Sequence, residues 1–83
     1  MGDGEVWRRW ETSTRYYVVL LHRDLLGDWV LTVAHGGRSN NLGALVHRAV
    51  GSREAGMVAL ENIAKTRKRH GYIPRPSANR VGL

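Results

Sequence analysis

The segment Arg15–Arg23 constrains the fold of this chain more than any other. It reads Arg-Tyr-Tyr-Val-Val-Leu-Leu-His-Arg, is rich in β-branched and aromatic residues, and carries apolar side chains on both of its alternating sets. The run is too short for a typical helix, and apolar residues on both sets are typical of a central strand. The sequence therefore predicts a sheet with residues 15–23 in its interior.

A hairpin is expected directly after this strand. Residues 24–28 interrupt the apolar run, and Gly27 can adopt the positive φ that a hairpin connection needs. Residues 29–35 then resume as a second, antiparallel strand. Alternation places Trp29, Leu31, Val33 and His35 on one face and Val30, Thr32 and Ala34 on the other. Trp29 is expected to belong to the core, since the chain has no Phe.

The remaining segments predict two more strands, a loop and a helix. Residues 5–11 and 44–50 are expected to be strands, and the Gly- and Asn-rich residues 36–43 a loop. Ser52 stands where a helix N-cap should, and apolar residues recur at spacings of three and four from residue 53 to 70. Gly71 supplies the stop, after which Tyr72-Ile73 can return to the sheet.

The size of the chain predicts a single domain. With 83 residues, 42% of them hydrophobic, it can bury one core but not two. Residues 1–5 are expected to be a flexible N-terminus and residues 74–83 a flexible basic tail. The first five residues are acidic where a signal peptide needs positive charge, and no apolar stretch approaches the ~20 residues that span a bilayer. A cytoplasmic protein without membrane contact is predicted.

Catalytic and metal chemistry have little support. The absence of Cys excludes disulfides and thiolate metal sites, and the four His residues at 22, 35, 47 and 70 lack the spacing of a zinc motif. The sequence contains no phosphate-loop spacing, no nucleophile elbow and no pair of carboxylates placed for acid–base work. We therefore expect no enzyme activity, no metal and no cofactor.

The net charge of +6 is unevenly distributed. Residues 1–37 carry four basic and five acidic side chains, whereas residues 38–83 carry nine and two. Such an imbalance points to a polyanionic partner, most often nucleic acid and less often an anionic membrane. The alternative is a solvated surface that keeps a small protein soluble.

The order of these features resembles the WGR domain from about residue 6 to residue 73. The shared features are the Tyr16-Tyr17 strand, the Leu26-Gly27-Asp28-Trp29 turn, a Gly-Arg loop, one helix opened by Ser52 and Ala55, and the closing Gly71-Tyr72. Of the Trp-Gly-Arg tripeptide that names the family, Gly37-Arg38 matches. The Trp position holds Gly36, or His35 if one extra Gly is allowed.

The resemblance implies an α+β fold, in which an antiparallel sheet of four to five strands has one α-helix packed across it. In poly(ADP-ribose) polymerases the WGR domain contacts DNA at strand breaks; its Trp packs on a terminal nucleotide and its Arg reaches the backbone. Only Arg38 carries this role over, with Gly37 as the small neighbour that lets a backbone approach. His35 is a smaller stacking platform, and Gly36 cannot stack.

Two functions follow as hypotheses. The first is a non-enzymatic nucleic-acid-binding module, with DNA favoured, that contacts the backbone regardless of base sequence. The alternative is a protein-interaction module, in which the sheet face or Trp7 and Trp10 dock a partner or a second copy. The sequence leaves the oligomeric state open. The candidate nucleic-acid-binding residues are Arg38, Gly37, His35, Arg48, Lys65, Arg67, Lys68 and Arg69. The four helical cations span more than one turn, so they are expected to fan around the axis.

Overall fold

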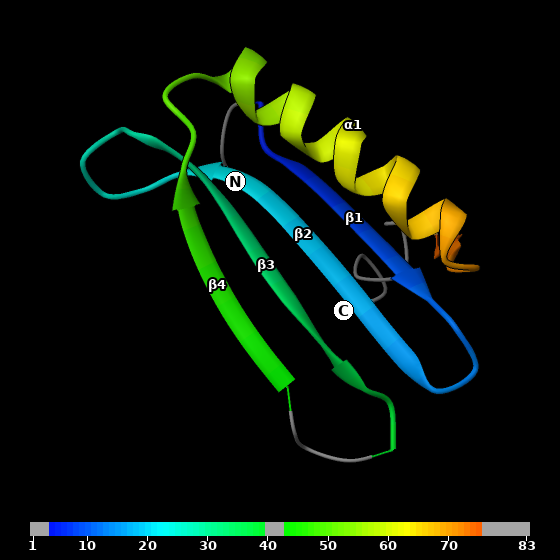
Figure 1. The fold of residues 1–83 in the computed structure, drawn as a ribbon. Helices are drawn as coiled ribbons and strands as arrows, with labels where there is room; N and C mark the ends of the chain where they lie inside the picture. Colours follow the sequence, from blue (N-terminus) through cyan, green and yellow to red (C-terminus); the bar gives the residue numbers. More distant parts are fainter. Residues whose placement is uncertain (1–3, 40–42, 76–83) are drawn as a thin grey trace.

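The computed structural model describes residues 4–39 and 43–75 (Figure 1). Five strands form one antiparallel sheet in the order β4-β3-β2-β1-β5, and α1 lies across one face of it (Figure 1). The α+β fold class predicted from the sequence is confirmed, with β2 in the interior of the sheet. The elements are β1 (Val6–Glu11), β2 (Arg15–Arg23), β3 (Trp29–Gly37), β4 (Gly43–Ala49), α1 (Arg53–Arg69) and β5 (Ile73–Arg75).

The core lies between α1 and the middle of the sheet. It is made of Val19 and Leu21 from β2, Leu31 from β3, Leu60 from α1, and Trp10 from β1. Trp29 is partly buried and packs against this cluster, as expected. Trp10 is 5% exposed, so its suggested role in docking a partner is wrong. The Trp side chain fills the core of a chain that has no Phe to do so.

The local signals at both ends of α1 act as the sequence predicts. The Ser52 hydroxyl accepts a hydrogen bond from the Ala55 N–H at 3.0 Å, and Gly71 follows the helix with a φ of 83°. Between these ends, Gly56 is buried against Leu21, and a Cβ at this position would collide with the leucine side chain. The absence of a side chain therefore allows α1 to sit close to β2.

Two predicted boundaries are wrong. Gly36 and Gly37 belong to β3 and Gly43 to β4, so the loop expected at residues 36–43 is shorter at both ends. Gly36 and Gly37 pair with β2, and Gly43 pairs with Gly36 of β3, so pairing overrides their loop preference. A Cβ at Gly43 would lie 2.9 Å from the His35 carbonyl oxygen and 3.0 Å from the Tyr16 hydroxyl, so the glycine leaves room for both. β5 reaches Arg75, so the expected tail boundary at residue 73 falls inside a strand. The predicted flexibility of residues 1–3 and 76–83 concerns segments outside the described residues.

None of the helical structure in residues 4–39 and 43–75 has the length and apolar composition that a membrane crossing requires.

Candidate nucleic-acid interface

The predicted site residues lie in separate regions of the molecule. Arg38 lies beside the turn between β1 and β2, whereas His35, Arg48 and Arg67 surround Tyr17 on the face of the sheet that carries α1. Period-two alternation explains the separation: His35 pairs with Tyr17 on the α1 face, while Arg38 approaches Glu11 on the opposite face. The structure therefore places two of the predicted site residues, His35 and Arg38, on opposite faces of the sheet.

Arg38 is anchored rather than freely solvated. Its backbone N–H donates to the Thr14 carbonyl at 2.8 Å, and its Nη1 donates to the Thr12 carbonyl at 3.0 Å. The Arg38 side chain is still 43% exposed. Gly37 pairs with Arg15 in the last position of β3 and has no positive φ, so it acts as a strand residue. The turn between β1 and β2 therefore sets the direction of the Arg38 side chain.

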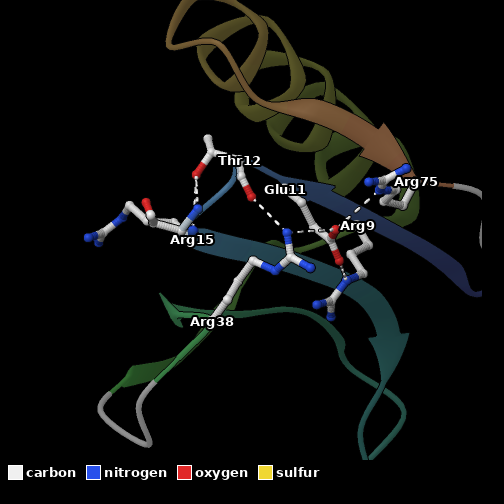
Figure 2. A network of polar contacts seen from close by, with 7 residues as sticks. Arg9, Glu11, Thr12, Arg15, Arg38 and Arg75 are labelled. Atoms are coloured by element: carbon white, nitrogen blue, oxygen red, sulfur yellow. Dashed lines mark hydrogen bonds and ion pairs between the residues drawn. The ribbon is translucent and has the colours of Figure 1, made fainter.

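Three arginines meet at the Glu11 carboxylate (Figure 2). Arg9 Nε lies 2.7 Å from Glu11 Oε2, Arg75 Nε lies 3.1 Å from Oε1, and Arg38 Nη1 lies 3.7 Å from Oε1. We call Arg9, Arg38 and Arg75 together with Glu11 the arginine cluster. One negative charge faces three positive ones, so the cluster carries a net positive charge.

The Glu11 side chain is 13% exposed, and its surroundings favour the ionised form. The hydrogen bond from Arg9 is the largest influence and lowers the pKa of Glu11 below its ordinary value. Burial acts in the opposite direction, and the hydrogen bond from Arg75 and the charge of Arg38 lower the pKa further. Glu11 thus stays ionised near neutral pH and holds the three guanidinium groups together.

Sequence reasoning missed most of this cluster. Of its four members, only Arg38 was among the predicted site residues. One signal was present: Arg9 and Glu11 are two residues apart in a strand and so share a face. Their meeting with Arg75 depends on β5 pairing with β1, which brings residues 64 positions apart into contact.

Tyr17 is the centre of the second region. The Arg67 guanidinium carbon lies 4.2 Å from the centroid of the Tyr17 ring, and the His35 ring stacks on Tyr17 at 5.4 Å with an interplanar angle of 13°. Arg67 also lies over Tyr72, 4.9 Å from its centroid. The Arg67 Nε is buried and finds no hydrogen-bond partner among residues 4–39 and 43–75. Tyr17 is thus already engaged by its own neighbours.

Two adjoining hollows of about 460 and 260 Å³ extend from Tyr17 between α1 and the β3–β4 side of the sheet. Both are lined by Tyr17, Arg48 and Ile63, and we call them together the Tyr17 groove. Its lining contains Arg48, Arg67 and His35 but no carboxylate among the described residues. The groove is therefore basic and partly apolar.

The other helical cations do not join either region. Lys65 and Arg69 are exposed, and Lys68 borders a different hollow beside Trp10 and Pro74. Arg67 points to Tyr17 and Lys68 to this other hollow, which confirms that the cations fan around the helix axis. They form no flat basic patch.

The face of the sheet away from α1 contains a hydrogen-bonded row that sequence reasoning also missed. Thr32 Oγ1 lies 2.8 Å from His22 Nε2 and 2.8 Å from His47 Nδ1, so one hydroxyl joins two imidazoles across three strands. No group of three or more His, Asp or Glu side chains in the described residues could hold a metal ion.

Comparisons of the chain with protein-family models, with curated proteins and with solved structures each find no match. The resemblance to the WGR domain therefore stays a prediction.

Proposed function

We propose that this protein is a non-catalytic module that binds the sugar–phosphate backbone of nucleic acid, DNA above all, through the arginine cluster. The supporting observation is that three guanidinium groups converge on one carboxylate and leave an excess of positive charge. Each guanidinium has five N–H donors, of which Glu11 and Thr12 use only a few. The remaining donors suit the oxygens of a phosphate.

Glu11 prepares the cluster for this role. Without a carboxylate, three neighbouring guanidinium groups would repel one another and spread into solvent. Glu11 and the Thr12 carbonyl hold them in place before a ligand arrives, which lowers the ordering cost of binding. A phosphate then meets side chains that are already positioned.

The state of Tyr17 argues for backbone contact rather than base stacking. Single-stranded nucleic acid is commonly bound by aromatic rings with a free face. In this protein Arg67 and His35 both lie against the Tyr17 ring. We therefore assign the Tyr17 groove a supporting electrostatic role, and Arg48, which is exposed, is its most accessible cation.

The test is a fluorescence-anisotropy titration with duplex DNA, single-stranded DNA and RNA at several salt concentrations between about 50 and 200 mM. Arg38→Gln and Arg75→Gln remove one charge each from the cluster, and the glutamine amide can still donate to a carbonyl. Arg23→Gln is the matched control, because it removes one exposed charge at the opposite end of β2.

We expect binding that weakens as salt rises, with the log–log salt slope reduced by about 1 for each cluster variant and little changed for the control. Equal effects of all three variants would assign binding to net charge alone and contradict the assigned site. Absence of binding at the lowest salt would overturn the proposed function.

A further inference from the structure

Among residues 4–39 and 43–75, no strand pairs with the outer edge of β4. All seven residues of this strand are exposed, Leu45 by 63% and Val46 by 52%, and the strand contains no Pro. Its pairing with β3 runs without a bulge from Val30–Ala49 to Gly36–Gly43. Edge strands usually carry Pro, several charges or a bulge that prevents pairing with another chain. The only charged residue of β4 is Arg48.

The hydrogen bonds around β3 determine which main-chain groups of β4 are free. The Val50 N–H donates to the Trp29 carbonyl at 3.1 Å, one position beyond the Val30–Ala49 pair. In an antiparallel ladder such pairs alternate with pairs that make no hydrogen bond. Val46 therefore directs its N–H and C=O toward β3. Leu45 and His47 direct theirs outward, as do Gly43 and Ala49.

We propose that a second copy of this chain binds this edge, with β4 pairing antiparallel to β4 about a two-fold axis at Val46. In this register Leu45 lies opposite His47 of the second copy, and Gly43 lies opposite its Ala49. Outward-directed groups therefore meet outward-directed groups along the full strand. Val46 faces its own counterpart as a pair without main-chain hydrogen bonds.

The side chains favour a second copy as the partner. The register places Arg48 opposite Ala44 of the other copy, so the one charge of the strand does not face its equivalent. The exposed Val46 side chains form an apolar cross-strand pair at the axis. Because this register pairs the outward main-chain groups of both strands and keeps the two Arg48 side chains apart, no other sequence is needed to complete the edge.

The dimer would have one continuous sheet with both helices on the same face, since a two-fold axis of this kind runs perpendicular to the sheet. The Tyr17 grooves of both copies would then open onto one side of the assembly. The inference does not depend on nucleic-acid binding. The net charge of +6 on each chain opposes association, so added salt strengthens the dimer while it weakens binding to nucleic acid.

The decisive test is cross-linking through a single introduced cysteine, because the natural chain has none. In the 83-residue chain, Val46→Cys places two thiols at a pair whose Cα atoms lie about 4.5 Å apart, within the range of a disulfide. The matched control Leu45→Cys puts the thiols at diagonal positions about 7–8 Å apart, too far for a bridge. Oxidised glutathione serves as the oxidant, and non-reducing electrophoresis gives the yield.

We expect Val46→Cys to form covalent dimer at least about tenfold faster than Leu45→Cys. Equal rates, or faster cross-linking of Leu45→Cys, would overturn the register. Sedimentation equilibrium over about 5–500 µM tests the dimer without cysteine. This concentration range is needed because an interface made by one pair of strands is small, and small interfaces bind weakly. Val46→Lys should abolish the dimer, whereas Leu25→Lys, which changes a fully exposed leucine in the β2–β3 turn, should preserve it.

A wild-type chain that stays monomeric throughout this range at high salt would refute the dimer and leave the nucleic-acid proposal untouched. Conversely, a salt-strengthened dimer that ignores DNA would refute the proposed function alone.

Discussion

The two edges of the sheet end in opposite ways. β5 has three residues, and Ile73 and Arg75 lie opposite Glu11 and Arg9 of β1. The Thr12 N–H bonds to the Arg15 carbonyl, so by alternation Glu11 and Arg9 turn their main-chain groups toward β5. The residue of β5 that faces outward is then Pro74, which has no N–H to offer. β4 has seven residues, and every second one directs its N–H away from β3, where the described part of the chain offers no partner strand.

This difference shows that one sheet can prevent strand pairing at one edge and permit it at the other. On the β5 side, Pro74 lacks the N–H that a further strand would need, and Arg75 forms an ion pair with Glu11. That edge is therefore short and charged, which disfavours pairing with another chain. On the β4 side, α1 provides no cover because it packs on β2 and β3. The contrast assigns the arginine cluster to one edge and the proposed self-association to the other.

Proline substitutions in β4 should have the largest effect on stability, and they test which main-chain groups of this edge are paired. Val46→Pro removes an N–H directed toward β3 and should cost about 3 kcal/mol of unfolding free energy. Leu45→Pro removes an outward N–H and should stay within about 1 kcal/mol of the wild type. Urea unfolding of both variants under monomeric conditions measures the difference. Equal costs would show that the assigned alternation, and with it the dimer register, is wrong.

Gly56→Ala tests whether the close approach of α1 to β2 positions the helix away from β4. The added Cβ collides with Leu21, so we expect a loss of about 1–3 kcal/mol although Ala favours a helix. Thermal unfolding gives the value. Combining the change with Leu21→Val, which makes room, should recover part of the loss. If Gly56→Ala instead stabilised the protein, close approach of α1 to β2 would not be what positions the helix.

Glu11→Gln tests the charged edge. The folded-state pKa of Glu11 is depressed, so its contribution to stability is present above the ordinary value of 4.5 and is lost as the pH falls through the lower folded value. We expect the wild type to be the more stable protein at pH 7, with the difference shrinking as the pH falls below 4.5. Thermal unfolding from pH 7 to pH 3 follows it, and a difference independent of pH would rule out this role for the carboxylate.

Pro74→Ala should have the smallest effect on stability, and it tests whether Pro74 prevents pairing at the β5 edge. We expect a loss of about 0.4–1 kcal/mol, since the unfolded chain gains freedom. Combined with Val46→Lys, the variant should remain monomeric in sedimentation, because one restored N–H on a three-residue strand is too little to hold a partner. Association of the double variant would instead identify β5 as a second docking edge that Pro74 blocks.

Local signals determined much of the fold. The apolar run of β2, the turn at Gly27, the Ser52 cap and the alternation of β3 are short-range features, and each could be predicted from neighbouring residues. Alternation also places His35 and Arg38 on opposite faces of the sheet. The glycines at 36, 37 and 43 were misjudged because pairing across the sheet outweighs their local preference.

The candidate site shows the same division. The sequence by itself determined that Arg38 is a cation in the Gly- and Asn-rich segment after a strand, that residues 44–50 carry one charge and no Pro, and that Pro74 lacks a donor. Only the tertiary structure decided that Arg9, Arg38 and Arg75 share one carboxylate, that Trp10 is buried and that β4 lies at an edge beyond the reach of α1. The physical reason is that strand order and helix position are set by long-range pairing and packing, which no local pattern in the chain specifies.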